Sequence, residues 1–331
     1  MLHRGALALT GLLLLVGCPN DPEGWHPAFD ADATGWLLNV WGPAGDDLYA
    51  AGGAPEAGVV MHYDGAAWTK LDLGLEVPLL NWSYGFGPDD ITVVGNGGTI
   101  LHYDGSSWSV QTTTTTEDLW GVWGSDPSNL WAVGGRGRAA GQDTILHYDG
   151  ATWTKIRTPE LSRPNVFAFF KVWGTSKDNV YVVGQRGAVL HYDGSTWTEE
   201  LVGTSEDLIS LWGTSPDQII IVGGRNNGQV VRWDGAEWTR KSLAPLPGLN
   251  GVWMRDATTA HVVGVGATIA TVDVATLTYT DASPLDADPT LDFHAIFGDS
   301  QGKLTTVGGS LNQVTAPFRG IAYVRELQDG E

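Results

Sequence analysis

Two short motifs in this sequence match signatures of catalysis or cofactor binding. Residues 298–302 read Gly-Asp-Ser-Gln-Gly and match the G-x-S-x-G elbow, in which a serine nucleophile at a strand-to-helix turn uses a downstream histidine. No histidine follows Ser300 in the chain. Residues 135–140 read Gly-Arg-Gly-Arg-Ala-Ala and match a shortened dinucleotide fingerprint, which has to open a helix. The strand-like segment 144–148 follows instead, so we expect both motifs to be ordinary loops and predict no cofactor.

Four histidines occupy one shared position in consecutive repeats of the chain. They are His62, His102, His147 and His191, each in an apolar segment that ends in Asp-Gly. Metal ligands must lie within about 2 Å of one ion, whereas sheets packed face to face lie about 10 Å apart. Equivalent positions on separate sheets cannot meet that condition. We therefore expect packing or hydrogen-bonding histidines and predict no metal site.

One set of basic residues recurs where loops are expected. The pattern Val-Gly-[Gly/Gln]-Arg ends an apolar run three times and places Arg136, Arg186 and Arg225 at matching positions. Arg138 and Arg163 lie in the same or the following connection. Arginine has the side chain best shaped for recognition of a carboxylate or phosphate. Two interpretations stay open: solvated loop charges beside flexible glycines, or a site for an anionic ligand or acidic partner.

Charge and composition exclude several classes of function. The chain has 38 acidic and 18 basic residues and a formal net charge of −20. This charge opposes contact with a phosphate backbone, so we predict no nucleic-acid partner. The hydrophobic share of 42% is enough for a folded core. With 45 glycines and 16 prolines, the composition favours short strands joined by turns over long helices.

The N-terminus has the pattern of an exported protein with a lipid anchor. Residues 1–17 combine Arg4 with an apolar stretch that is too short to span a bilayer and is typical of a signal peptide. The segment 15–18, Leu-Val-Gly-Cys, resembles the bacterial lipobox, and Cys18 is the only cysteine. The resemblance implies a lipidated Cys18 on a short tether, residues 18–24, with no other contact to the membrane. The alternative is an ordinary signal peptide that contains a buried cysteine.

The remaining residues, 25–331, consist of seven repeats of about 43 residues, which is the length of a four-stranded propeller blade. An aromatic residue, followed by glycine in all but the sixth repeat, marks each one: Trp41, Tyr84, Trp123, Trp173, Trp212, Trp253 and Phe297. Each repeat contains four strand-like segments, and in the first five an Asp-Gly turn joins the third to the fourth. We predict an all-β, seven-bladed β-propeller with four antiparallel strands per blade.

Five tryptophans follow these Asp-Gly turns at a fixed spacing. They stand three positions after the glycine, as Trp68, Trp108, Trp153, Trp197 and Trp238. We expect them to pack between neighbouring blades and not to form a ligand site. The sixth and seventh repeats lack both the turn and the tryptophan, as terminal units of a repeat array often do.

The last repeat lacks a fourth strand, and the N-terminus offers one. Residues 320–324 align with third strands elsewhere, and no further strand follows. Residues around 25–29 precede the first repeat and contain a tryptophan like those of the other fourth strands. We predict that this segment pairs with the strand near Tyr323 and closes the ring, which covers an otherwise unpaired edge. The tether then leaves from the face of the Asp-Gly turns, and the arginine loops point away from the membrane.

The repeat units resemble bacterial propeller repeats of the kelch, Asp-box and photosystem-assembly-factor kinds. Residues 132–137 and 145–153 are similar to the kelch glycine doublet with its Tyr and Trp, and residues 98–108 resemble the Asp-box hairpin. The sequence departs from the Asp-box because its Asp and Gly are adjacent and no Ser or Thr precedes them. The resemblance covers nearly all of residues 25–331 and implies a propeller lipoprotein without a particular chemistry.

Taken together, these features predict a monomeric binding module or scaffold and not an enzyme. We expect it at the bacterial cell envelope, lipid-anchored in the outer membrane, with other envelope proteins or acidic glycans as partners at the arginine loops. A glycan-processing enzyme of the sialidase type is the alternative, because its arginines hold a substrate carboxylate. The Phe/Tyr-Arg-Ile-Pro motif and the Tyr–Glu pair of sialidases cannot be identified here. A purely structural scaffold is a third interpretation.

Overall fold

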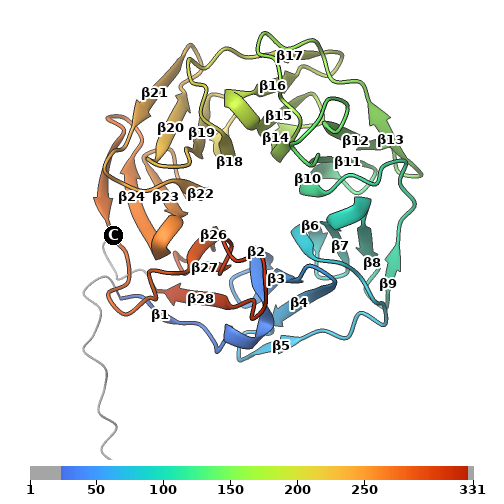
Figure 1. The fold of residues 1–331 in the computed structure, drawn as a ribbon, viewed down its shortest axis with the longest axis vertical. Helices are drawn as coiled ribbons and strands as arrows, with labels where there is room; N and C mark the ends of the chain where they lie inside the picture. The colour runs from blue at the N-terminus through green and yellow to red at the C-terminus, as the bar shows by residue number, and fades with distance from the viewer. Residues whose placement is uncertain (1–23, 327–331) are drawn as a thin grey trace, which may run out of the picture.

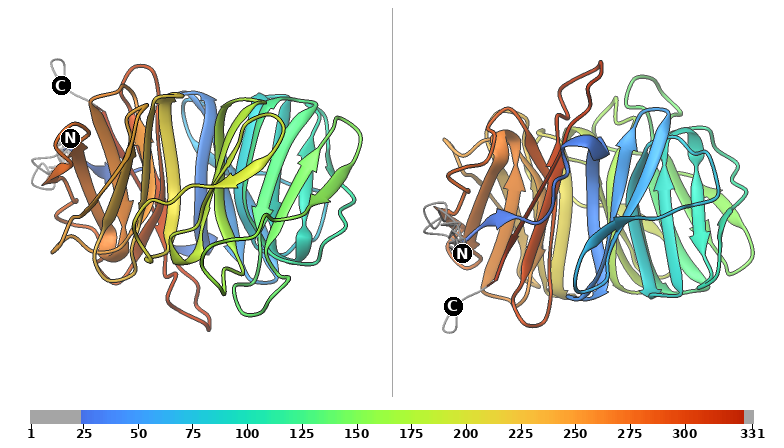
Figure 2. Two further views of the ribbon diagram at one scale, coloured as in Figure 1. Left: turned by 90° about the horizontal axis from the view of Figure 1, so that it is seen from above. Right: turned by 90° about the horizontal axis from the view of Figure 1, so that it is seen from below.

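Seven four-stranded antiparallel sheets are arranged like blades around a central axis in the computed structural model, which describes residues 24–326 (Figure 1). In the first six blades the strands follow chain order from the axis outward. Seen from the side, the strands run between the two faces of a thick disc (Figure 2). The predicted propeller fold is therefore confirmed. The predicted signal peptide, Cys18 and nearly all of the tether lie outside the described residues.

The first four blades share one plan, in which the outermost strand is the shortest. The first blade holds β2 (Trp36–Ala44), β3 (Asp47–Ala54), β4 (Ala57–Tyr63) and β5 (Trp68–Lys70). The second holds β6 (Leu80–Gly87), β7 (Asp90–Gly95), β8 (Ile100–Tyr103) and β9 (Trp108–Val110). The third holds β10 (Leu119–Asp126), β11 (Asn129–Gly134), β12 (Thr144–Tyr148) and β13 (Trp153–Ile156). The fourth holds β14 (Phe169–Ser176), β15 (Asn179–Gly184), β16 (Val189–Tyr192) and β17 (Trp197–Glu199).

The last three blades also have four strands each, with one change in the seventh. The fifth blade holds β18 (Leu208–Ser215), β19 (Gln218–Gly223), β20 (Gln229–Trp233) and β21 (Trp238–Ser242). The sixth holds β22 (Leu249–Met254), β23 (Thr259–Gly264), β24 (Thr268–Asp273) and β25 (Thr278–Asp281). The seventh holds β26 (Asp292–Gly298), β27 (Leu304–Gly309) and β28 (Gly320–Arg325), together with β1 (His26–Pro27) from the N-terminal side of the chain.

Helical structure within residues 24–326 is limited to single 3-10 turns of three residues. They are η1 (Asp32–Thr34), η2 (Asn96–Gly98), η3 (Gln185–Gly187) and η4 (Val265–Ala267). In this part of the chain no helix has the length and apolar character needed to cross a membrane.

The loops divide between two faces of the disc. In the first five blades the Asp-Gly turn packs on the turn between the first and second strands of the same blade: a Cβ on Gly105 would lie 2.7 Å from the Asp89 side chain. Within the turn, the Asp104 carboxylate accepts hydrogen bonds from the N–H groups of Ser106 and Ser107, both at 2.9 Å. We call this side the Asp-Gly face. The opposite side, with the loops between second and third strands, is the Arg face.

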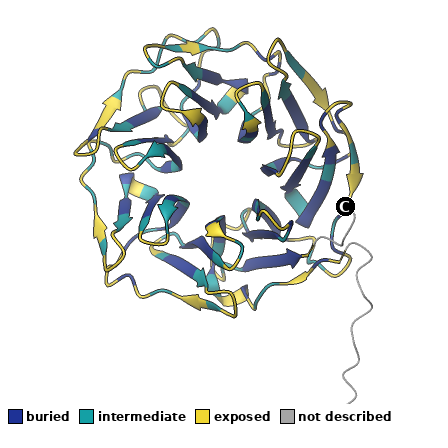
Figure 3. Cartoon of the chain, turned by 180° about the vertical axis from the view of Figure 1, so that it is seen from behind, coloured by how far each residue is buried: buried dark blue, intermediate teal, exposed yellow. Residues whose placement is uncertain are grey.

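The aromatic–Gly signature has a packing cause at the innermost strands. The indole of Trp173 lies over the glycine of the next blade, where a Cβ on Gly213 would come within 2.6 Å of the ring. The same contact joins Trp41 to Gly85 and Trp253 to Gly298. Glycine is needed at these positions because a neighbouring ring occupies the space of a side chain. Buried residues accordingly follow the strands around the axis (Figure 3).

The tryptophans after the Asp-Gly turns lie between blades, as predicted. Trp197 meets Trp131 of the preceding blade edge to face, with ring centroids 5.2 Å apart. Trp153 donates a hydrogen bond from Nε1 to Oε1 of Gln111 at 2.6 Å. These aromatic contacts fill the widening space between blades at the outside of the ring.

Ring closure also follows the prediction. In β1, His26 pairs with Val324 and Pro27 with Tyr323, so the N-terminal segment is the outer strand of the seventh blade. Trp25 is buried and belongs to the same hydrophobic cluster as Phe293, Ile321 and Tyr323 of the seventh blade. The proline is tolerated because this strand forms an edge, where one N–H group can be spared.

The sixth blade is complete although it lacks Asp-Gly and the tryptophan. The turn from β24 to β25 has four residues between the paired Asp273 and Thr278, as many as the Asp-Gly turns have, and Asp273 accepts a hydrogen bond from the N–H of Thr276 at 2.7 Å. Leu277 takes a left-handed conformation with φ 53° and buries its side chain in the core of the blade. The left-handed residue of this turn is thus a buried leucine and not a glycine.

Candidate functional site

The two motifs that match catalytic signatures lie in loops, as expected. Ser300 belongs to the turn between β26 and β27, where the Asp299 carboxylate accepts hydrogen bonds from the N–H groups of Gln301 (2.8 Å) and Lys303 (2.9 Å). A strand follows this turn, whereas the serine elbow requires a helix. Residues 135–140 lie in the loop between β11 and β12, again with no helix after them. Neither context supports the chemistry of its motif.

The four equivalent histidines are hydrogen-bonded within their own blades. His62 Nε2 lies 2.7 Å from Oδ1 of Asp47, and His191 Nε2 lies 2.7 Å from Oδ1 of Asn179. Tyr181 stacks on the His191 ring at a centroid distance of 4.3 Å. His102 and His147 make the corresponding bonds, at 3.0 Å, to Asp90 and Asn129. The prediction of packing and hydrogen-bonding histidines is confirmed.

The three loops that carry four of the predicted arginines are neighbours on the Arg face. Nε2 of Gln185 donates to the carbonyl of Gly137 at 3.3 Å, which joins the loop of the third blade to that of the fourth. The Asp207 carboxylate joins the fourth blade to the fifth: one oxygen accepts from the N–H of Arg186 at 2.9 Å and the other from Nη2 of Arg225 at 2.8 Å. Loops 135–143, 185–187 and 224–228 therefore form one continuous surface, which we call the Arg sector.

Two arginines of the Arg sector are already compensated by carboxylates. Arg225 donates from both Nε and Nη2 to Asp207 and lies over the Phe170 ring at 5.7 Å. Nε of Arg136 lies 3.8 Å from Glu117 and 3.9 Å from Asp118. These acids were not part of the predicted site, although aspartate recurs five residues before the inner-strand aromatic in the third, fifth and seventh blades.

The other three predicted arginines differ in their surroundings. The side chains of Arg138 and Arg186 are exposed and make no hydrogen bond or ion pair with residues 24–326. Arg163 lies in the connection that follows the third blade and is half-buried beside Leu161, Asn165 and Asp143, in a small hollow of about 230 Å³ at the edge of the Arg sector. The structure thus brings four of the five predicted arginines onto neighbouring loops and leaves two of them free to meet an anion.

Arg186 is held in an unfavourable backbone conformation. Its φ is 57°, in the left-handed region, whereas the equivalent residues of the second and sixth blades are Gly97 (φ 66°) and Gly266 (φ 68°). A residue with a Cβ costs about 1–2 kcal/mol there relative to right-handed backbone. Strain of this kind persists only where the surrounding structure enforces it, and it is concentrated at functional sites.

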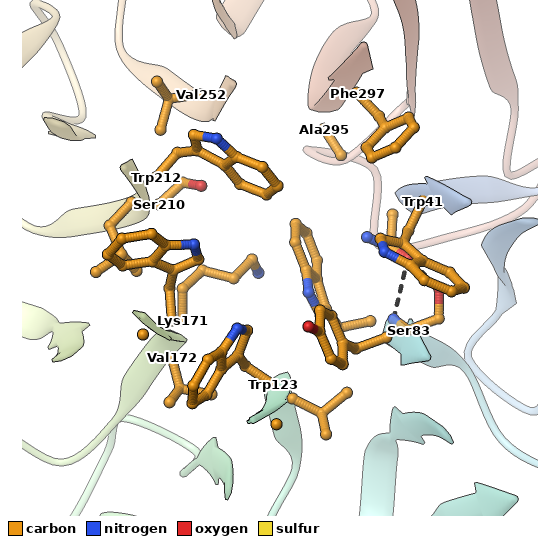
Figure 4. A pocket seen from close by; sticks show the side chains of 18 of the residues that line it. Trp41, Ser83, Trp123, Lys171, Val172, Ser210, Trp212, Val252, Ala295 and Phe297 are labelled. Atoms are coloured by element: carbon orange, nitrogen blue, oxygen red, sulfur yellow. Dashed lines mark hydrogen bonds between the residues drawn. The ribbon is translucent and has the colours of Figure 1, made fainter. Parts of the chain in front are cut away.

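The inner strands enclose a second candidate site, a pocket of about 630 Å³ on the axis (Figure 4). Its walls are mainly the aromatic residues of the repeat signature: Trp41, Tyr84, Trp123, Trp173, Trp212 and Phe297. It extends to Asp126 and Lys177, where the inner strands end, and therefore opens toward the Asp-Gly face. The sequence analysis identified the aromatic repeat but not this pocket.

A lysine projects into the pocket near its inner end (Figure 4). Lys171 is 4% exposed, and its Nζ donates to the carbonyl of Trp120 at 2.9 Å and lies 3.9 Å from the centre of the Trp82 ring. Burial lowers the pKa of this ammonium to about 7. The equivalent position holds asparagine, tryptophan, glycine, serine or alanine in the other blades. The sequence signal for this site was therefore one charged residue at a repeat position that is uncharged in every other blade.

Comparison with known proteins identifies the fold. No protein-family model matches this chain, and no curated protein matches it. A structure of YCF48 bound to D1 peptide superposes with a TM-score of 0.66 at 14% identity, covering 92% of this chain and 97% of that one. YCF48 from Cyanidioschyzon merolae gives a TM-score of 0.66 at 13% identity, covering 92% of this chain and 99% of the other. At these identities the likeness shows a shared seven-bladed propeller architecture.

Proposed function

We propose that this protein is a binding propeller that receives an acidic segment of a partner protein on the Arg sector. The proposal rests on the side-chain exposure and the backbone conformation of Arg186. Its exposed side chain makes no polar contact with residues 24–326, yet its backbone occupies a conformation that glycine fills in the equivalent loops. The fold gains a backbone hydrogen bond to Asp207 at this position but no hydrogen bond or ion pair from the arginine side chain. A role in recognition therefore explains the side chain better than a role in stability.

Charge supports an acidic partner. With a net charge of −20, the chain repels acidic molecules from most of its surface. Arg138 and Arg186 offer guanidinium groups that no carboxylate of the described residues neutralises. Arg136 and Arg225 add positive charge nearby, but Asp118 and Asp207 hold them in place. An incoming carboxylate would meet Arg138 and Arg186 first.

A polypeptide ligand fits what is known of similar structures. One structurally similar protein, YCF48, has been solved with a D1 peptide bound. A propeller of this architecture can therefore hold a peptide. Acidic glycans offer the same carboxylate chemistry, and the experiment below separates them from peptides.

A lipid anchor on Cys18 remains part of the proposal. Gly24 and Trp25 precede β1 and lie at the Arg325 end of β28, which belongs to the Asp-Gly face. A tether that leaves there would place the Arg sector on the side away from the membrane. The chain should fractionate with membranes and incorporate labelled palmitate, and Cys18→Ser should abolish both. A Cys18→Ser chain that stays with the membrane would contradict the anchor.

Selection from a displayed library of random peptides tests the partner class. The Cys18→Ser chain is the bait, and each selected peptide is then measured against Arg138→Ala/Arg186→Ala. We expect acidic peptides whose affinity falls at least about tenfold in that variant, since each charge-assisted contact contributes about 1.5–3 kcal/mol. Lys70→Ala/Arg240→Ala removes the same charge from exposed outer strands and should change nothing.

Three outcomes would contradict the proposed function. The selected peptides could lack acidic residues, they could bind both double variants equally, or the sector could bind uronate or sialylated glycans and no peptide. The last result would assign the sector to glycans.

A further inference from the structure

The axial pocket is separate from the Arg sector, because it opens on the other face of the ring. Its mouth is formed where β10 and β14 end, at Asp126 and just beyond Ser176. The Arg sector follows the second strands at the opposite ends of the blades. A ligand in the pocket would therefore not compete with a peptide on the Arg sector.

Lys171 is the only charged residue in the pocket lining apart from the two at its mouth, Asp126 and Lys177. An ammonium has three N–H donors. One is used by the carbonyl of Trp120, and the Trp82 ring faces the group at 3.9 Å. No carboxylate among residues 24–326 forms an ion pair with it. A buried charge without a counter-ion is costly, and an anion in the pocket would remove that cost.

A second donor lines the same pocket. Ser210 stands at the position of the fifth blade that Lys171 occupies in the fourth, and both side chains face the cavity (Figure 4). The Ser210 hydroxyl makes no hydrogen bond with another described residue. The hydroxyl of Ser83, by contrast, is already used by Asn39. One ammonium and one free hydroxyl suit a monoanion with two oxygens better than a phosphate, which needs more donors.

The aromatic walls of the pocket favour a ligand whose uncharged part is flat and apolar. Six indole or phenyl rings and one phenol surround the cavity and offer flat apolar surfaces. In the sixth blade Met254 stands where the other blades have glycine, and Nε1 of Trp212 donates to the Met254 carbonyl at 3.1 Å. The Trp212 ring is half-buried and lines the pocket. Planar apolar groups stack on such rings.

We propose that the axial pocket binds a monocarboxylate on a flat apolar body, with the carboxylate on Lys171 Nζ and the body between the aromatic walls. The carboxylate can belong to a small aromatic acid or to the C-terminus of a peptide that ends in an aromatic residue. Both present the same group to Lys171, so the two sources are separated by experiment.

Binding should depend on the proton of Lys171. The free protein loses this proton at about pH 7, and a bound carboxylate favours the protonated form. The facing groups do not change charge in this range: the pKa of His294 is lowered to about 3 by burial and by the charge of Lys171, and burial raises the pKa of Tyr84 to about 12. At the mouth, hydrogen bonds from Ser128 lower the pKa of Asp126, and Lys177 is paired with Asp178. Affinity should be constant from about pH 5 to 7 and then fall up to tenfold per pH unit.

Titration calorimetry with 2-naphthoate tests the proposal on the Cys18→Ser chain. We expect saturable binding at millimolar concentration or below, with proton uptake at pH 8 that appears as a dependence of the heat on buffer ionisation. 2-Naphthamide, which keeps the body and removes the charge, should bind at least about tenfold more weakly. Lys171→Met should abolish the preference for the acid, and Lys70→Met, on the exposed outer strand of the first blade, should keep it.

A peptide ending in phenylalanine, with a free or an amidated C-terminus, identifies the source of the carboxylate. Binding of the free acid alone assigns the site to chain termini, and binding of 2-naphthoate alone assigns it to small acids. The proposal is overturned if neither acid binds, if acid and amide bind equally, or if the wild-type chain binds without proton uptake at pH 8. The last measurement needs no variant and stays decisive even if Lys171→Met fails to fold.

Discussion

The Arg sector and the axial pocket both present cations, and their surroundings are opposite. In the Arg sector the charges are exposed on surface loops, and carboxylates such as Asp207 hold some of them. In the pocket one ammonium, that of Lys171, is buried among aromatic rings without a carboxylate. The two regions therefore differ in how much the stability of the fold depends on their side chains. The pocket is lined by side chains of the inner strands that also form the core of the ring, whereas the Arg sector consists of surface loops outside that core.

The largest expected effect is a loss in the free energy of unfolding when a wall of the axial pocket is removed, a loss that we do not expect in the Arg sector. Trp173→Ala removes a pocket wall that is also a core side chain packed over Gly213. We expect a loss of about 3–5 kcal/mol in the free energy of unfolding, measured by urea titration, because a buried tryptophan leaves a cavity. A loss below about 1 kcal/mol would show that the walls are not part of the core.

The next effect concerns the buried charge. Folded Lys171 loses its proton at about pH 7, whereas the unfolded chain keeps it until about pH 10.4. Between these values the unfolded state binds more protons, so the wild-type chain gains stability as pH rises. At pH 6, Lys171→Met should therefore be more stable than wild type by about 1–4 kcal/mol.

That advantage should shrink as the pH rises from 7 toward 10, by up to about 1.4 kcal/mol per unit. Urea titrations of both chains at pH 6, 7.5 and 9 measure it, with Lys177→Met as the matched control. A pH-independent difference would mean that Lys171 titrates normally.

A smaller effect tests the strain at Arg186. Arg186→Gly should raise the free energy of unfolding by about 0.5–1 kcal/mol, because glycine fits the left-handed conformation but loses more entropy on folding. The same change should weaken binding of an acidic peptide. Thermal unfolding and peptide titration measure the two effects. A less stable Arg186→Gly chain would show that the arginine side chain supports the fold.

The smallest effect is expected for the compensated arginines. Arg136→Ala and Arg225→Ala each remove an exposed ion pair, which contributes about 0–1 kcal/mol and is weakened by salt. The melting temperature of each variant should stay close to that of the wild type, and any difference should vanish in high salt. A salt-independent loss of several degrees would place these arginines among the structural residues.

The fold could be predicted from the sequence because propeller blades repeat. The aromatic–Gly pair, the Asp-Gly turn and the following tryptophan each occur in at least five copies, so the two irregular blades did not hide the pattern. Closure was predictable for a physical reason: the seventh blade needed a fourth strand, and Trp25 marked the segment that provides it. Repetition thus carried the information about architecture.

The sites could be predicted only in part for the same reason. The arginine positions recur and were found, but their compensation by Asp118 and Asp207 depends on contacts between loops of different blades. Lys171 occurs once, and its environment comes from Trp82 and Trp120 of the second and third blades. A property created by three blades meeting at the axis is not visible in one repeat.

Hydrogen–deuterium exchange on the Cys18→Ser chain, with and without a selected acidic peptide, tests the central claim most directly. We predict protection of backbone amides in loops 135–143, 185–187 and 224–228, with no change at residues 125–128 and 175–178 on the Asp-Gly face. The protection should disappear in Arg138→Ala/Arg186→Ala and persist in Lys70→Ala/Arg240→Ala. Protection on the Asp-Gly face, or equal protection in both double variants, would contradict recognition by the Arg sector.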